Sequence, residues 1–220
     1  MSGKIGPDIN ENGLVLYLDA ANRNSYPGTG TTWRDLSGNN NTGTLTNGPT
    51  FSAANMGSIV FDGTNDYVSF GVLIDSTTTV SAEMWFYNTQ ASGESILLMN
   101  GNGSNAGYTI GLGLCSSGIT NLTVLFGGIA CNVVTATVST NTWYQMVYTK
   151  TGSSNILYVN GTQRSTANQN CNSPSGNLTT IGGSAGGYKG NIAITRMYNR
   201  VLSAAEVLQN YNATKSRFGL

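Results

Sequence analysis

Histidine is absent from the 220 residues of this sequence. It is the usual general base of nucleophilic triads and the commonest ligand of transition metals, so sites of both kinds would lack their ordinary component. Charge is scarce as well: charged residues make up 9% of the chain, and ten basic residues balance ten acidic ones. Nucleic-acid binding needs a basic excess to neutralise phosphates, and the scattered charges form no polybasic patch for a membrane surface. We therefore expect no nucleic acid and no membrane among the partners.

Cysteine and long apolar runs are also rare. The three cysteines, Cys115, Cys131 and Cys171, are an odd number without paired spacing, which leaves open one disulfide plus a free thiol or three reduced thiols. No apolar run reaches the ~18 residues of a membrane span. The first thirteen residues, "MSGKIGPDINENG", contain no apolar core of a secretory signal. The expectation is a soluble protein made in a cytoplasm.

Apolar and neutral polar residues make up most of the sequence. Apolar residues make up 39% of the chain, with 11 Tyr and 29 Gly, and Asn, Thr and Ser dominate the polar remainder. A chain of this length can bury about 70% of the surface that it exposes when extended, so it can form a stable core without disulfides or bound metals. Neutral surfaces associate easily unless they are covered, so we expect a homo-oligomer or a protein partner.

Short strand-like runs bounded by turn residues recur along most of the chain. In "TVSAEMWFYN" (79–88), apolar residues alternate with Ser81, Glu83, Trp85 and Tyr87, the period-2 pattern of a sheet with two different sides. In "NILYVNGTQRS" two runs meet at Asn160–Gly161, a pair that favours a type I′ hairpin.

Only the end of the chain has a helical pattern. In "LSAAEVLQNYNA", Ser203 and Glu206 have the spacing of a capping box, and Val207, Leu208 and Tyr211 follow as one apolar stripe. The prediction is an all-β fold, a two-sheet antiparallel jelly-roll sandwich with one short helix at about 204–213. The sandwich would span 14–214 as a single domain, between an N-terminal arm (1–13) and a C-terminal tail (215–220).

Catalysis finds little support in the residues. Glycoside hydrolysis usually needs two carboxylates about 5–10 Å apart, and no strand-like run carries acids at i and i+2. Glu83 is the one acid in the middle of a strand, beside Trp85, and a hydrogen-bond acceptor fits it better than a catalytic acid. We predict no catalytic residue and no enzyme.

Calcium is the metal that this inventory permits, because it binds carboxylate, amide and backbone oxygens without histidine or cysteine. The turn in "FDGTNDYVSF" (61–70) offers Asp62, Asn65 and Asp66 as ligands. The alternative is that Asp62 and Asn65 bind their own backbone in an Asx-type turn.

Exposed aromatic rings are the usual platform for sugars, whose C–H faces stack on them. The residues selected as a carbohydrate site are Trp33, Glu83, Trp85 and Tyr87. Trp143 lies at the start of a strand, at the rim or in the core, and we expect two of the three tryptophans to be core residues.

Several segments in order resemble the LamG-like jelly roll of the concanavalin A-like lectin/glucanase superfamily. They are "GLVLYLDAANRNSYPGTGTTWRDLSGNNNTGTL", "VFDGTNDYV", "EMWFY", "TWYQMVYT", "LYVNG" and "GNIAITRMYNRVLSAAEV". The resemblance implies binding of glycans or proteins at the rim of the sandwich, often with calcium. Some relatives are glycanases, but the strand with paired acids is missing here.

The loop "SGNNNTGTL" and the ending "YNATKSRFG" resemble single-domain proteins encoded by tailed bacteriophages. This implies a non-enzymatic virion structural protein, either a capsid decoration or a tail or fibre module, with other virion proteins as partners and cell-surface glycans as possible contacts. The protein would be made in the host cytoplasm and reside in the virion. The alternatives are a free-standing calcium-assisted lectin and a glycan hydrolase or lyase.

Overall fold

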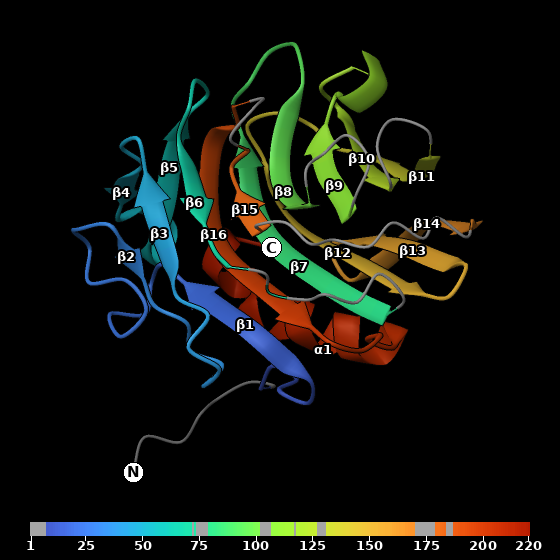
Figure 1. The fold of residues 1–220 in the computed structure, drawn as a ribbon, viewed down its shortest axis with the longest axis horizontal. Helices are drawn as coiled ribbons and strands as arrows, with labels where there is room; N and C mark the ends of the chain where they lie inside the picture. The colour runs from blue at the N-terminus through green and yellow to red at the C-terminus, as the bar shows by residue number, and fades with distance from the viewer. Residues whose placement is uncertain are drawn as a thin grey trace.

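Two antiparallel sheets stand face to face in the computed structural model, which describes residues 8–71, 73, 79–101, 107–116, 118–126, 131–169, 179–183 and 187–220 (Figure 1). Sheet A has, in spatial order, β14 (Thr162–Asn168), β13 (Ser154–Val159), β12 (Trp143–Thr151), β7 (Thr79–Asn88), β16 (Lys189–Tyr198), β5 (Ser58–Asp62) and β4 (Thr50–Ser52). Its remaining described strand, β1 (Leu14–Asp19), pairs with the second half of β16.

Sheet B has the order β11 (Cys131–Thr137), β10 (Asn121–Phe126), β9 (Gly107–Leu112), β8 (Ser95–Gly101), β15 (Thr179–Ile181), β6 (Tyr67–Ser69), β3 (Gly43–Thr46) and β2 (Thr32–Trp33). The helical elements are η1 (Ala54–Met56), η2 (Leu114–Ser116), α1 (Ala204–Thr214) and η3 (Lys215–Phe218), of which only α1 is an α-helix. Within the described residues, the predicted antiparallel jelly-roll sandwich with one C-terminal helix is confirmed, and no helix has the length and hydrophobicity to span a bilayer.

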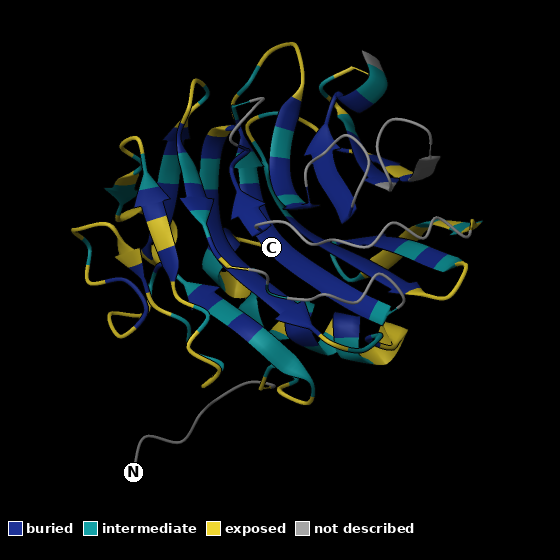
Figure 2. Cartoon of the chain, in the orientation of Figure 1, coloured by how far each residue is buried: buried dark blue, intermediate teal, exposed yellow. Residues whose placement is uncertain are grey.

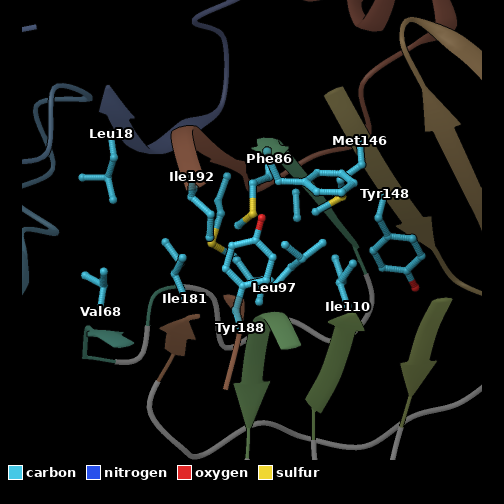
Figure 3. Close-up of a cluster of buried hydrophobic side chains, with 14 of the residues drawn as sticks. Leu18, Val68, Phe86, Leu97, Ile110, Met146, Tyr148, Ile181, Tyr188 and Ile192 are labelled. Atoms are coloured by element: carbon cyan, nitrogen blue, oxygen red, sulfur yellow. The ribbon is translucent and has the colours of Figure 1, made fainter. Parts of the chain in front are cut away.

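The main core lies between the sheets. Side chains of sheet A point toward those of sheet B, with Tyr188 extending between them; the labelled residues are Leu18, Phe86, Met146, Tyr148 and Ile192 on one side and Val68, Leu97, Ile110 and Ile181 on the other (Figure 3). The strands are therefore mostly buried and the connecting loops exposed (Figure 2). Period-2 alternation explains this arrangement, because every second residue of a strand faces the partner sheet.

The predicted hairpin at Asn160–Gly161 is confirmed. Strands β13 and β14 pair antiparallel, and both turn residues have positive φ, 51° for Asn160 and 72° for Gly161. An Asn-Gly pair adopts this left-handed conformation with little strain, so the register of the edge hairpin is fixed locally.

Helix α1 covers sheet A on its outer face, the face turned away from sheet B. Its capping box is as predicted: the Ser203 hydroxyl accepts from the Glu206 N–H, and the Glu206 carboxylate accepts from the Ser203 N–H. The predicted apolar stripe is wrong in one position, because Leu208 is 47% exposed. Asn210 is fully buried on the side of the helix that faces the sheet, where its side-chain amide donates to the carboxylate of Glu83 on β7.

Both ends of the described chain pack on the sandwich. Asn10 of the arm binds α1, its backbone N–H donating to Asn210 Oδ1 and its side-chain amide to Glu206 Oε1. The last residues form η3 and bury Phe218 on the outer face of sheet A. Residues 1–7 of the predicted arm lie outside the described residues.

Candidate functional site

Three side chains form a row across the outer face of sheet A. Asn191 on β16 lies opposite Tyr87 on β7, and Tyr87 lies opposite Trp143 on β12. Directly opposed residues have Cβ atoms roughly 5 Å apart, so the register alone brings these groups together. The Tyr87 and Trp143 ring centroids are 5.5 Å apart with the planes inclined by 46°. All three side chains are half-buried.

The row lines a cavity of about 360 Å³, completed by Ala54, Asn55 and Ser58. The indole N–H of Trp143 donates to Asn55 Oδ1 at 3.1 Å, and the Asn191 amide donates to Ser58 Oγ at 3.0 Å. Among the described residues, the Tyr87 hydroxyl and Asn191 Oδ1 make no hydrogen bond. The cavity thus combines two aromatic rings with free hydrogen-bonding groups.

The C-terminal segment holds this cavity from one side. Phe218 packs against Trp143 with ring centroids 4.7 Å apart, and Arg217 Nε donates to the carbonyl oxygen of Asn55 at 2.7 Å. The Asn55 amide donates in return to the Arg217 carbonyl oxygen at 3.3 Å. Asn55 has a positive φ of 50°, a conformation that asparagine tolerates better than most residues. The Asn55 side chain is therefore held in place by hydrogen bonds to the Trp143 indole and to the Arg217 backbone.

Trp85 was selected from the sequence as a sugar contact, and the structure corrects this. The indole is fully buried, stacked between Phe218 at 4.1 Å and Tyr211 at 5.9 Å, and its N–H donates to Thr214 Oγ1 at 3.0 Å. The alternation that sets Trp85 and Tyr87 on one face of β7 is as predicted, but α1 and η3 cover the Trp85 position. Tyr87 lies one row beyond the cover and stays accessible.

The structure also corrects the prediction that Glu83 contacts a sugar. Glu83 is 1% exposed, and both of its carboxylate oxygens are occupied. Oε1 accepts from Arg196 Nη1 at 2.8 Å and from Gln145 Nε2 at 2.9 Å, and Oε2 accepts from Asn210 Nδ2 at 2.7 Å. Glu83 is a hydrogen-bond acceptor as expected, but inside the protein, where it cannot meet a sugar.

Trp33, the third selected side chain, is also a core residue and is fully buried between the sheets. Of the four residues predicted as a carbohydrate site, only Tyr87 lies in the cavity described above. The expectation that two of the three tryptophans belong to the core is confirmed, and the accessible one is Trp143.

The turn at 61–70 uses its acids to bind backbone. Asp62 Oδ1 accepts from the Thr64 N–H at 2.7 Å, the predicted Asx-type contact, and Asp66 Oδ2 accepts from the Asp62 N–H at 3.0 Å. Asn65 is exposed, and its backbone oxygen accepts a hydrogen bond from the Asn47 side-chain amide at 2.9 Å. Asp66 is 3% exposed, and burial raises its pKa.

Calcium takes six to eight oxygen ligands, and this turn does not bring such a set together. Two of its carboxylate oxygens already accept from N–H groups, and no cluster of three acidic, cysteine or histidine side chains occurs in the described part of the chain. The turn as folded does not fit a calcium ion.

A second cavity, of about 410 Å³, lies between the arm, β1 and the C-terminal segment. Its charged side chains include Asp19 and Arg217, paired with each other at 2.6 Å, and Arg196, whose guanidinium lies over the Tyr17 ring at 4.8 Å. Asp19 and Arg217 neutralise each other, and Arg196 pairs with Glu83 through Nη1, while its Nε and Nη2 are buried without a hydrogen-bond partner among the described residues.

The model of one protein family, the concanavalin A-like lectin/glucanases superfamily, matches residues 62–208, which is more than half of the sequence. The chain belongs to this superfamily. The match spans the strands that carry Tyr87, Trp143 and Asn191. No curated protein matches the sequence significantly.

Solved structures agree on the fold of this concanavalin A-like domain. Domain 4 of AbnA, a GH43 extracellular arabinanase from Geobacillus stearothermophilus, in complex with arabinotriose, is 16% identical with a TM-score of 0.71, and the alignment covers 92% of this chain and 100% of that one. Trypanosoma rangeli sialidase is 16% identical with a TM-score of 0.70, over 93% of this chain and 33% of that one.

The botulinum neurotoxin serotype D binding domain is 12% identical with a TM-score of 0.68, over 91% of this chain and 52% of that one. The present domain therefore spans about half of the toxin domain and a third of the sialidase. At these identities the likeness concerns the fold alone.

Sequence reasoning missed Asn55, Ser58 and Asn191 and left Trp143 unassigned. A signal for part of the site existed: aligning the strands 79–88 and 143–151 antiparallel sets Trp143 opposite Tyr87. No local signal marks Asn55, because its position depends on the fold of the C-terminal segment onto sheet A. Ser58 is placed by the pairing of β5 with β4 and β16, which no local pattern predicts.

Proposed function

We propose that this concanavalin A-like domain is a non-enzymatic glycan-binding module and that a sugar ring lies against Tyr87 and Trp143. The observation that carries the proposal is the cavity in which two accessible rings meet the free Tyr87 hydroxyl and Asn191 Oδ1. Cavities for small ligands have this character, mostly apolar and aromatic walls with a few placed polar groups, and volumes upward of about 300 Å³.

The site gives no basis for hydrolysis. A glycosidase needs two carboxyl groups flanking the scissile bond, and the six residues that line the cavity in the described part of the chain include no carboxylate. Glu83, the acid nearest along β7, is buried and bound by three donors. Binding without turnover is therefore the function proposed.

The setting proposed for the module is a bacteriophage virion, as a capsid decoration or a tail or fibre component. This part rests on the resemblance of "SGNNNTGTL" and "YNATKSRFG" and on the neutral, amide-rich composition. Its test is to band particles from a lysate of the producing host on a density gradient and to search the band for this chain by mass spectrometry. Recovery of the chain only in the soluble fraction would refute the setting while leaving glycan binding open.

Glycan binding is tested on an array probed with the wild-type chain, Trp143→Ala and Tyr87→Ala. We expect both variants to lose at least tenfold in affinity, since stacked aromatic contacts are typical binding hot spots. Tyr67→Ala is the matched control, because Tyr67 is a half-buried tyrosine on sheet B, away from the cavity. Equal binding by wild type and both cavity variants would refute the proposed site.

Two additional measurements complete this experiment. Circular dichroism and thermal melting establish that each variant is folded, which matters because Trp143 also packs against Phe218. Repeating the array with a chelator tests the calcium-assisted lectin. Binding that disappears with the chelator would favour that alternative, and binding that is unchanged would exclude it.

A further inference from the structure

We infer that the Tyr87–Trp143 cavity selects neutral sugars and discriminates against sialylated, uronate-containing and sulfated ones. This inference rests on the proposed function and specifies its ligand class. Of the residues that the structure describes, none that lines the cavity carries a charge at neutral pH; they are Ala54, Asn55, Ser58, Tyr87, Trp143 and Asn191. Recognition of a carboxylate or sulfate ordinarily relies on Arg or Lys, whose charge-assisted hydrogen bonds offset the cost of removing the anion from water.

Arg217 lies next to the cavity, and its guanidinium is already hydrogen-bonded to other groups of the protein. Its Nε donates to Asn55 O at 2.7 Å, its Nη1 to Asp19 Oδ1 at 2.6 Å, and its Nη2 to Gly57 O. Asp19 balances its charge, and all three nitrogens have protein acceptors. Turning this guanidinium toward an anionic ligand would break the contacts that hold Asn55 in place.

The free polar groups of the cavity favour a hydroxyl-bearing ligand. Because the Asn191 amide donates to Ser58 Oγ, its carbonyl oxygen is left as an acceptor, and the Tyr87 hydroxyl can donate or accept. A sugar hydroxyl can donate to Asn191 Oδ1, whereas a carboxylate has no proton to give and would be repelled by that oxygen. The Asn55 oxygen accepts from Trp143 and one of its two amide hydrogens goes to Arg217, so what remains for a carboxylate is a neutral N–H, without the charge that would offset the desolvation of the anion.

The test compares neutral oligosaccharides with acidic counterparts of the same backbone, for example lactose with 3′-sialyllactose, on the array and by calorimetry. We expect the neutral member of each pair to bind at least tenfold more tightly and to lose that affinity in Trp143→Ala. An acidic member that binds as tightly as its neutral parent, with the same dependence on Trp143, would overturn the ligand class and leave the proposed function standing. Absence of any Trp143-dependent binding to either member would overturn both.

Ala54→Lys provides a gain-of-function variant. Ala54 is exposed on the wall of the cavity, so a lysine there adds a cation without removing a ring or an amide. The ratio of acidic to neutral binding should rise at least threefold at low ionic strength and fall back as salt screens the added charge. A ratio that does not move would contradict the explanation by charge.

Discussion

Glu83 and Arg196 form an ion pair between neighbouring strands of sheet A, at directly opposed positions of β7 and β16. Both side chains are fully buried under α1. Burial alone would lower the pKa of the arginine, but the Glu83 carboxylate together with Tyr17 and Tyr198 outweighs burial and keeps the pKa above its ordinary value. The arginine is therefore charged inside the protein, and Gln145 and Asn210 supply the further donors to the buried Glu83 side chain.

Glu83→Gln should destabilise the fold strongly, because it leaves the Arg196 charge buried without a counter-charge. Removing one partner of a buried pair costs about 3–5 kcal/mol in the free energy of unfolding. Chemical denaturation monitored by tryptophan fluorescence measures this loss. The double variant Glu83→Gln with Arg196→Met should recover part of it, since no unpaired charge remains. A single variant that loses less than about 1 kcal/mol would contradict the structural role given to this acid.

At the scale of elements, the segment α1–η3 decides which part of sheet A is accessible. It covers the rows of Glu83 and Trp85 and ends at Phe218, which packs against both Trp85 and Trp143. The row of Tyr87 begins where this cover stops. The start of α1 is anchored by Glu206, whose carboxylate accepts from Arg200 and from the backbone of Ser203.

Acid should loosen this segment through Glu206. Its hydrogen bonds with Arg200 lower its pKa from the ordinary 4.5 to about 2, so the carboxylate is bound better in the folded chain than in the unfolded one. The stabilisation is complete above pH 4.5 and is lost as the pH falls from there toward 2. Denaturation of wild type and Glu206→Gln should differ by about 1 kcal/mol at neutral pH and converge toward pH 2. A difference that is the same at both pH values would argue against this linkage.

The sequence patterns predict the strands, the hairpin and the helix start. They do not predict which strand residues the C-terminal segment covers. Alternation in 79–88, the Asn160–Gly161 pair and the capping box at Ser203 each depend on neighbours in sequence, and each prediction is confirmed. Whether Trp85 or Tyr87 is exposed depends instead on where Phe218 docks, and its contact with Trp85 joins residues 133 positions apart, which no local pattern encodes. The pair of Glu83 and Arg196 was detectable in principle, as opposite charges in the middle of two strands.

At the scale of the whole molecule, charge neutrality and a half-open site suit weak binding by many copies. Ten basic and ten acidic residues leave no net field to steer a ligand. The proposed site offers two rings and few free polar groups to one sugar. On the particle proposed as its setting, useful attachment to a glycan-coated surface would then come from the number of copies displayed, because linked sites raise avidity without new contacts.

A tetramer of the domain should therefore bind glycan surfaces far more tightly than the monomer. We expect a gain of about 10²–10⁴-fold when the singly biotinylated chain is assembled on streptavidin and compared with the free chain by surface plasmon resonance on an immobilised neutral glycan. The Trp143→Ala tetramer is the control, since it has the same geometry without the proposed ring contact. If it keeps the full gain, the avidity comes from another surface of the molecule. If the wild-type tetramer binds no more tightly than the monomer, display by many copies is not how this domain attaches.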